Sequence, residues 1–297
     1  MIFPPPLPAG ATVGLVSPSS PLPAGSLDKA TARLESLGFR VRLSPGVYAQ
    51  ERFLAGDDRL RAAELNAFFE DDSVDAVFAS RGGYGTQRIL ERIDYTLIRR
   101  KPKAFVGLSD TTALQNALLT RCGLVSYSGF LPYSDAGTGQ ISPVTEMSLQ
   151  AALNHEDQSF AGETLCPGEA SGPLIGGCLT LVSGLLGTPY FPDPEGAVLV
   201  LEDVGEDPYR IDRMLAHLEL AGIFRRVAAV VFGEFYKCVS KDSADGTIDD
   251  VLNEWGHRIG KPVLRNIPYG HQPNHIVLPL GGRAAVENGS LYISGKA

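Results

Sequence analysis

Over the first half of this chain, short apolar runs alternate regularly with helical patterns, and this alternation constrains the fold more than any other feature. The runs TVGLV (12–16) and KAFVGL (103–108) have the length and composition of buried strands, whereas SLDKATARLESLGF (26–39) repeats apolar residues at helical spacing. Strands that alternate with helices predict a parallel sheet covered on both faces. In such sheets, functional residues gather in the loops at the carboxyl ends of the strands.

A polar segment then divides the chain. NHEDQSFAGETLCPGEASG (154–172) carries little periodicity, so we predict an N-terminal α/β domain over residues 1–155, a linker over 156–172 and a second domain over 173–297. The length of 297 residues is enough for two cores. The second domain contains the strand GAVLVLED (196–203) and ends in short apolar runs with an Asn288-Gly289 turn signal. We therefore expect a mixed β/α unit with a β-rich tail.

Charge and cysteine usage exclude several classes of function. The formal net charge is -8 and no basic stripe is present, so neither nucleic acid nor a membrane surface is an expected partner. The four cysteines are far apart, which predicts reduced thiols and no metal site. The N-terminus MIFPPPLPAG has no charged leader and is broken by prolines, which is typical of neither a signal peptide nor a membrane anchor. A cytoplasmic protein is expected.

Ser109, in VGLSDTTALQNALL, stands where a strand meets a helix. It could cap the helix with its hydroxyl, or it could be a nucleophile raised on a tight turn. Gly107-Leu108-Ser109-Asp110-Thr111 resembles a G-x-S-x-G elbow but has threonine at the last position. On this pattern alone we favour capping.

A serine nucleophile needs a base, and five histidines are available. His271 lies in NIPYGHQPNHIVLPLGG, where prolines and Gly270 frame an irregular loop before a strand. His275 lies four residues further on, and composition does not choose between the two. Solvated or packing roles suffice for the other three, which are His155, His217 and His257.

The base in turn needs a carboxylate to orient it. Glu202 and Asp203 end the apolar strand GAVLVLED, and consecutive residues of a strand point to opposite faces. Only one of them can therefore face a given site, and the spacing leaves the choice open.

The glycine-rich stretch FASRGGYGTQRIL follows another predicted strand. Its glycines would free backbone N–H groups for a phosphate or an oxyanion, or would simply allow a helix to pack closely on the sheet. It matches neither the dinucleotide fingerprint nor the P-loop. Arg81 adds a cation that could hold a substrate carboxylate.

Four stretches in this order, ASRGGYG, VGLSDTTAL, LEDVGEDPYRIDRML and IPYGHQPNHIVLPLGG, resemble the LD-carboxypeptidases, or muramoyltetrapeptide carboxypeptidases, and their relatives the microcin C immunity peptidases. The resemblance implies a serine peptidase in which Ser109 is the nucleophile, Glu202 orients the base and His271 is the general base. It also implies an oxyanion hole of backbone N–H groups at Asp110 and at the Gly82-Gly83 turn. Substrate-side roles fall to Arg81 and Tyr84.

The resemblance implies a flavodoxin-like, doubly wound parallel sheet in the first domain and a mixed β/α second domain with a small barrel-like sheet. Ser109 would come from the first domain, and Glu202 and His271 from the second. Such a site forms only when the domains dock, so we expect a fixed or dimer-supported interface, and a homodimer.

The function implied is removal of the terminal D-alanine from murein tetrapeptides during cell-wall recycling, in the cytoplasm and without a cofactor. One alternative is an immunity-type peptidase that cleaves aminoacyl-nucleotide analogues. An alternative of another class is a non-catalytic protein that binds an anion or small ligand with the RGGYG loop, for which Ser109→Ala would leave function intact.

Overall fold

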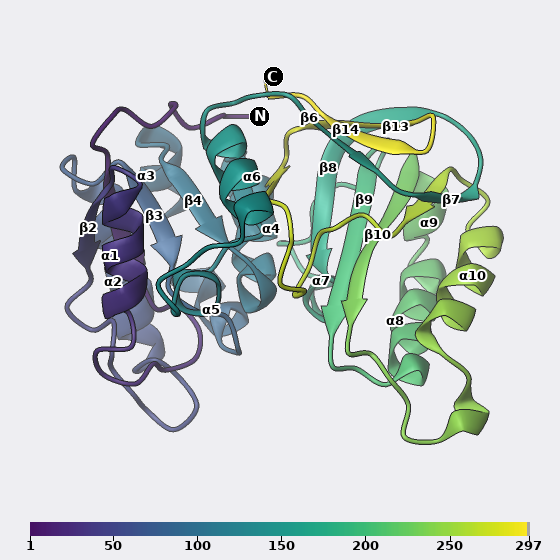
Figure 1. Ribbon diagram of the computed structural model, residues 1–297, viewed down its shortest axis with the longest axis horizontal. Helices are drawn as coiled ribbons and strands as arrows, with labels where there is room; N and C mark the ends of the chain where they lie inside the picture. Colours follow the sequence, from purple (N-terminus) through teal and green to yellow (C-terminus); the bar gives the residue numbers. More distant parts are fainter. Residues whose placement is uncertain (296–297) are drawn as a thin grey trace.

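The computed structural model describes residues 1–295, and its strands form two sheets side by side, each with helices packed on it (Figure 1). The first half of the chain builds the α/β unit, mostly purple and blue, and the strands of the second sheet run from teal through green to yellow. Within residues 1–295, no helix has both the length and the apolar character that crossing a lipid bilayer requires.

The first sheet has the strand order β12-β5-β4-β3-β1-β2. Strands β1 to β5 run parallel, and their order 2-1-3-4-5 is that of flavodoxin-like folds, as predicted. The bounds are β1 (Thr12–Val16), β2 (Arg40–Leu43), β3 (Ala76–Ala79), β4 (Ala104–Gly107), β5 (Ser126–Ser128) and β12 (Leu278–Leu280). The helices of this half are α1 (Asp28–Ser36), α2 (Asp58–Glu70), α3 (Tyr95–Arg100), α4 (Thr112–Cys122), α5 (Pro132–Asp135) and α6 (Pro143–Leu153), with 3-10 turns η1 (Thr86–Arg92) and η2 (Ser109–Thr111).

Helix α4 lies between the two sheets. Its residues from Thr112 to Leu119 are all buried, and it contacts β4 and β5 on one side and β8 and α7 of the second half on the other. A helix that is covered all round has no polar stripe facing solvent, so the polar residues of α4 are buried with the rest. The Asn116 amide donates hydrogen bonds of 2.8 Å to the Thr112 and Gly176 carbonyls. The nucleophile candidate Ser109 directly precedes this central helix.

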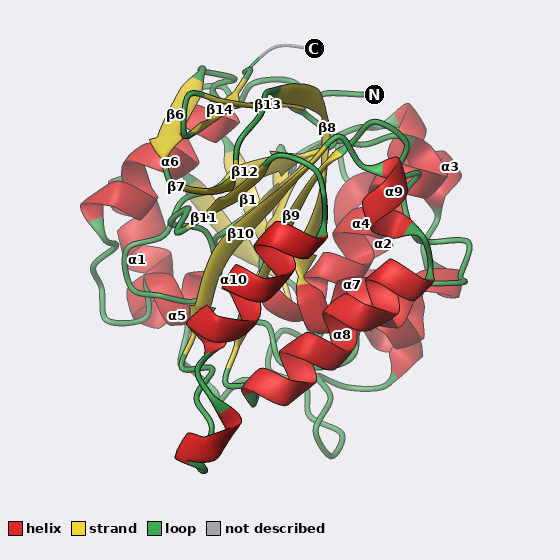
Figure 2. Cartoon of the chain, turned by 90° about the vertical axis from the view of Figure 1, so that its right-hand side faces the viewer, coloured by secondary structure: helices red, strands yellow, loops and turns green. Residues whose placement is uncertain are grey.

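The second sheet has the order β6-β14-β13-β8-β9-β10-β11-β7. Its central strands β8 to β11 are parallel, and antiparallel strands flank them. The bounds are β6 (Gln158–Ala161), β7 (Glu163–Cys166), β8 (Ala170–Cys178), β9 (Val198–Val204), β10 (Ala229–Tyr236), β11 (Val263–Arg265), β13 (Arg283–Glu287) and β14 (Ser290–Ile293). The helices are α7 (Leu179–Leu185), α8 (Pro208–Leu220), α9 (Ile223–Arg226) and α10 (Ile248–Arg258), with the 3-10 turn η3 (Ser243–Asp245). Figure 2 shows α8 and α10 lying across β9 and β10.

The two edge strands of this sheet, β6 and β7, are joined by Gly162 alone. Opposite edges of the sheet therefore meet, and the sheet curls into the nearly closed, barrel-like form that was predicted. The hairpin between β13 and β14 turns at Asn288 and Gly289, with φ of 50° and 71°, as expected for an Asn-Gly two-residue turn.

The predicted linker is wrong in structural terms. Residues 156–172 contain β6, β7 and the start of β8, all paired in the second sheet. Their alternation is short and interrupted by Gly162 and by Pro167-Gly168, and these flanking strands keep many side chains exposed, so the stretch resembles a loop.

The chain also crosses back between the halves. Strand β12, predicted within the second domain, pairs antiparallel with β5 and completes the first sheet. The run TQRILERI has a helical pattern but forms the 3-10 turn η1. Helix α3 follows it and is capped by the Asp94 side chain, which accepts a hydrogen bond of 2.8 Å from the Leu97 N–H.

Candidate active site

Ser109 occupies a sharp turn between β4 and α4. Its φ is 66°, in the left-handed region, and the preceding Leu108 is extended with φ of −160°. A non-glycine residue in this region costs about 1–3 kcal/mol and persists where the surroundings hold it. A side chain at Gly107 would collide with Thr111, whose hydroxyl donates to the Leu108 carbonyl at 3.0 Å. Thr111, which stands where the elbow pattern has its last glycine, therefore packs against Gly107, the first glycine of the pattern.

The capping interpretation of Ser109 is wrong. Neither η2 nor α4 has a side-chain hydrogen bond at its N-terminus, and Thr111 does not supply one either. The Ser109 side chain is partly exposed at the carboxyl end of β4. A partly exposed serine with positive φ at the end of a strand fits the geometry of a nucleophile elbow, and the catalytic role of Ser109 stays a prediction.

The glycine loop, residues 81–85, lies against Ser109. A Cβ on Gly82 would lie 2.9 Å from the Ser109 Cβ and 3.1 Å from its Oγ. Within residues 1–295, no acceptor takes the backbone N–H of Gly82 or Gly83, whereas the next N–H groups are used: that of Tyr84 donates to Ser20 Oγ at 3.1 Å. The two free donors belong to the loop that packs against Ser109, and their role as an oxyanion hole stays a prediction.

The loop is tied to the residue after the nucleophile. The buried Asp110 carboxylate accepts hydrogen bonds from the N–H groups of Gly85 at 3.1 Å and Thr86 at 2.9 Å. On its other side, the buried guanidinium of Arg61 donates to the carbonyls of Pro18 and Gly85. The pattern of α2 gave no signal for Arg61, because a charged residue in a helix ordinarily faces solvent.

Arg81 and Tyr84 flank this loop. The Arg81 guanidinium donates to the Pro21 carbonyl at 2.6 Å and lies 5.4 Å from the centre of the Tyr133 ring. Tyr84 is 46% exposed and its ring lies 5.7 Å from that of Phe53. These contacts hold Arg81 at the loop, and its role toward a substrate carboxylate stays a prediction.

The structure brings Glu202 and His271 together. Glu202, at the carboxyl end of β9, is fully buried, and its Oε2 lies 2.7 Å from His271 Nδ1. Asp203 points the other way, where its carboxylate accepts from the Thr180 N–H at 2.9 Å and hydroxyl at 2.8 Å near the start of α7. The alternation along the strand thus places one carboxylate against His271 and the other against Thr180.

Glycines let the histidine loop, residues 266–277, approach the Glu202 carboxylate. Gly270 has φ of 140°, and a Cβ there would lie 3.0 Å from Glu202 Oε2. A side chain at Gly233 on β10 would collide with the Tyr269 carbonyl. Both positions therefore need glycine for His271 to reach Glu202.

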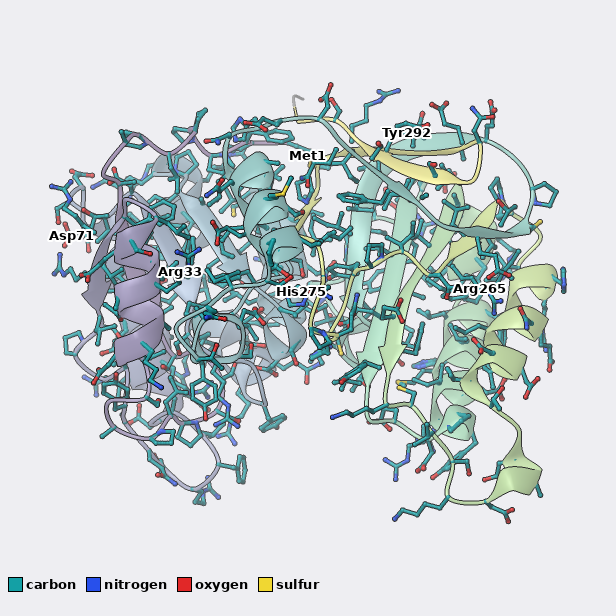
Figure 3. The ribbon with its side chains drawn as sticks, in the orientation of Figure 1. Met1, Arg33, Asp71, Arg265, His275 and Tyr292 are labelled. Carbon is teal, nitrogen blue, oxygen red and sulfur yellow. The ribbon has the colours of Figure 1, made fainter. Side chains whose placement is uncertain are left out.

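His275 has a separate, structural environment. Figure 3 places it near the centre of the molecule, where the two halves meet. It is 3% exposed, its Nδ1 lies 2.6 Å from the Gln272 carbonyl, and its Nε2 lies 3.6 Å from an Asp135 carboxylate oxygen. Its Nδ1 is thus held by the backbone of its own loop, while its Nε2 lies near a carboxylate without a hydrogen-bond partner among residues 1–295.

The environment of the pair sets its charge. Burial of the His271 imidazole opposes its charged form, but the adjacent Glu202 carboxylate outweighs this and raises the pKa of His271 above its ordinary value. Burial also raises the pKa of Glu202. Nδ1 faces Glu202, while the buried Nε2 has no hydrogen-bond partner among residues 1–295. Nε2 is the nitrogen left to accept a proton.

Within residues 1–295, no group of three histidine, cysteine, aspartate or glutamate side chains gathers as metal ligands.

Comparison with known proteins identifies the family. Residues 13–129 match the LD-carboxypeptidase N-terminal domain and residues 171–286 match the LD-carboxypeptidase C-terminal domain. The "Probable murein peptide carboxypeptidase" of Bacillus subtilis is 38% identical over 283 residues, which cover 93% of this chain and 89% of that protein. The chain belongs to the LD-carboxypeptidase family.

Solved structures agree with this LD-carboxypeptidase assignment. The muramoyltetrapeptide carboxypeptidase from Oxalobacter formigenes superposes with a TM-score of 0.88 at 31% identity, covering 96% of this chain and 99% of that one. MccF in complex with glutamyl sulfamoyl guanosine gives a TM-score of 0.89 at 22% identity, with 98% of each chain covered. At that identity, the likeness to MccF establishes a common fold.

Proposed function

We propose that this LD-carboxypeptidase is a serine hydrolase that cleaves the L,D peptide bond before the terminal D-alanine of murein tetrapeptides, in cell-wall recycling. The observation that carries the proposal is the partly buried 2.7 Å contact between His271 Nδ1 and Glu202 Oε2, which leaves Nε2 free. The strained Ser109 turn and the free N–H groups of the glycine loop support it. The structural relative named as a muramoyltetrapeptide carboxypeptidase supports the substrate class.

In the proposed reaction, Ser109 Oγ attacks the carbonyl carbon of the L-configured centre of the diamino acid while His271 Nε2 takes its proton. The oxyanion receives hydrogen bonds from the N–H of Asp110 and from the Gly82-Gly83 turn. His271 then gives the proton to the departing amine of D-alanine, and an acyl-enzyme remains. Water, deprotonated by His271, hydrolyses that ester and restores Ser109.

Glu202 keeps the imidazole in the required orientation and stabilises its cation during each transfer. Arg81 and Tyr84, at the rim of the glycine loop, are proposed to bind the substrate, with Arg81 holding a carboxylate.

We also propose that the enzyme works in the cytoplasm and as a homodimer. All four cysteines, Cys122, Cys166, Cys178 and Cys238, are free thiols, which suits a reducing compartment. Light scattering tests the assembly: a homodimer has twice the chain mass of 31.7 kDa.

The substrate class is tested by incubating the protein with a murein tetrapeptide and measuring D-alanine release, beside the diastereomer that ends in L-alanine and an aspartyl sulfamoyl adenosine. We expect rapid release from the L,D peptide and little from the other two. Preferential cleavage of the sulfamoyl adenosine would instead support the immunity-type alternative, and turnover of none of the three would refute the proposal.

A further inference from the structure

Two buried hydrogen bonds cross between the sheets beside the proposed triad. The first joins Ser128 Oγ on β5 to the Tyr269 hydroxyl at 2.7 Å. In the second, the Cys178 N–H at the end of β8 donates to Thr112 Oγ1 at 3.1 Å. All four residues are buried. Each bond thus joins a residue of the nucleophile's half to one of the base's half.

The Ser128–Tyr269 bond lies at the level of both Ser109 and His271. Ser128 is the register partner of Gly107, which precedes Ser109 by two residues. Tyr269 precedes His271 by two residues, and its carbonyl accepts from the Glu234 N–H on β10 at 2.8 Å. The phenol therefore connects the histidine loop directly to the strands that carry the nucleophile.

The Thr112–Cys178 bond makes the equivalent connection for the carboxylate. Thr112 is the first residue of α4, three positions after Ser109, and Cys178 is the register partner of Glu202. The approach depends on Gly177, which has φ of 120° and where a Cβ would lie 2.7 Å from Thr112 Oγ1. The glycines of the IGGC segment thus let the two halves close to hydrogen-bond distance.

We infer that Thr112 and Tyr269 are positioning residues that set the separation between Ser109 and the Glu202–His271 pair. The inference rests on the proposed function, because it assumes that these three residues react together. Neither hydroxyl takes part in the chemistry. Each fixes one member of the pair relative to the nucleophile, and a misplacement of about 1 Å can cost on the order of 100-fold in rate.

The test compares Tyr269→Phe and Thr112→Val with a matched control, Tyr127→Phe. Tyr127 is the neighbour of Ser128 on β5, is equally buried, and its hydroxyl contacts His155 at 3.0 Å on the other face of the sheet. We expect Tyr269→Phe and Thr112→Val to lower kcat about 10- to 100-fold with little change in KM. Tyr127→Phe should keep kcat within about twofold of wild type, even if its melting temperature falls as far as those of Tyr269→Phe and Thr112→Val.

Two further comparisons separate a loss of alignment between the reacting groups from a general loss of stability. Thr112→Ser keeps the acceptor oxygen and should recover most of the kcat lost in Thr112→Val. In a double-mutant cycle, Ser128→Ala added to Tyr269→Phe should lower kcat little further, because both remove the same bond. Equal kcat losses in Tyr269→Phe and Tyr127→Phe, or a fall confined to KM, would overturn the inference.

A fluorophosphonate probe makes the result independent of the murein substrate. Ser109 Oγ forms a bond to phosphorus, fluoride leaves, and His271 takes the serine proton, so the labelling rate reports the alignment of the pair alone. Labelling should slow about 10-fold in Tyr269→Phe and stay unchanged in Tyr127→Phe. If wild-type protein is labelled but releases no D-alanine, the proposed murein substrate is refuted. The labelling rates of the variants then still test whether Thr112 and Tyr269 position the reacting groups. No labelling of wild-type protein would overturn both.

Discussion

At the level of single residues, the proposed chemistry depends on one nitrogen of His271. Its Nδ1 faces Glu202, so in the proposed reaction Nε2 is the nitrogen that takes the serine proton. The residue types at this site are predictable from the sequence, since a strand-end carboxylate and a loop histidine stand out. The choice of Glu202 over Asp203 is not predictable from spacing, because it depends on which face of β9 meets the histidine loop.

Glu202→Gln should change the pH profile in a definite direction. The Glu202 carboxylate raises the pKa of His271 above its ordinary 6.5, so kcat/KM of the wild-type enzyme should fall as the pH drops through that raised pKa and the base becomes protonated. A neutral amide removes the effect, so the acidic limb should move to lower pH, while kcat falls roughly 10³- to 10⁴-fold. An unmoved limb in a pH–rate series would contradict the pairing.

Gly82→Ala should impair catalysis more than folding. The φ of Gly82 lies outside the left-handed region, but the added Cβ would lie 2.9 Å from the Ser109 Cβ and displace the nucleophile by a few tenths of an ångström. We expect kcat to fall about 10-fold or more with a small change in melting temperature. Gly187→Ala is the contrasting control: its φ of 77° and open surroundings predict lower stability with unchanged kcat.

At the level of elements, most of the parallel strands and long helices are predictable, because they have strong periodicity and clear ends. Strands β6 and β7 escape prediction because they lie at the sheet edges with exposed side chains. The segment TQRILERI has a helical pattern but forms a 3-10 turn, because Asp110 and Arg61 hold its start at Gly85 and Thr86. Tertiary contacts override local preference there.

Asp203→Ala tests the division of labour along β9. Loss of the carboxylate that binds Thr180 near the start of α7 should lower the free energy of unfolding by about 1–2 kcal/mol in a denaturant titration. The negative charge of Asp203 also contributes to the raised pKa of His271, so a small downward shift of the acidic limb is expected. A shift as large as that of Glu202→Gln would mean that the two carboxylates share the orienting role.

For the whole molecule, the two halves are interlocked rather than merely docked. Strand β12 returns from the second half to complete the first sheet, and α4 is buried between both. Sequence patterns cannot show this, since a three-residue strand has no periodicity of its own and the partner of an apolar helix is not encoded locally. The predicted domain boundaries at residues 155 and 172 therefore mark a change in composition, and they do not separate two parts that we expect to fold independently.

Interlocking predicts that the fragment of residues 1–155 does not fold stably. It lacks β12 and would expose the face of α4 that packs against β8 and α7. We expect a single cooperative thermal transition for the full chain and a broad, non-cooperative change for the fragment, measured by circular dichroism. A sharp transition in the fragment would show that the first half is an independent domain.

We propose above all that Ser109, in the first half of the molecule, is activated by His271 and Glu202 in the second. The most direct measurement is D-alanine release from a murein tetrapeptide by wild type and by Ser109→Ala at equal folded concentration. Because the variant should keep the fold but lacks the proposed nucleophile, we expect a loss of at least about 10⁴-fold in kcat. Equal release by both proteins would contradict it.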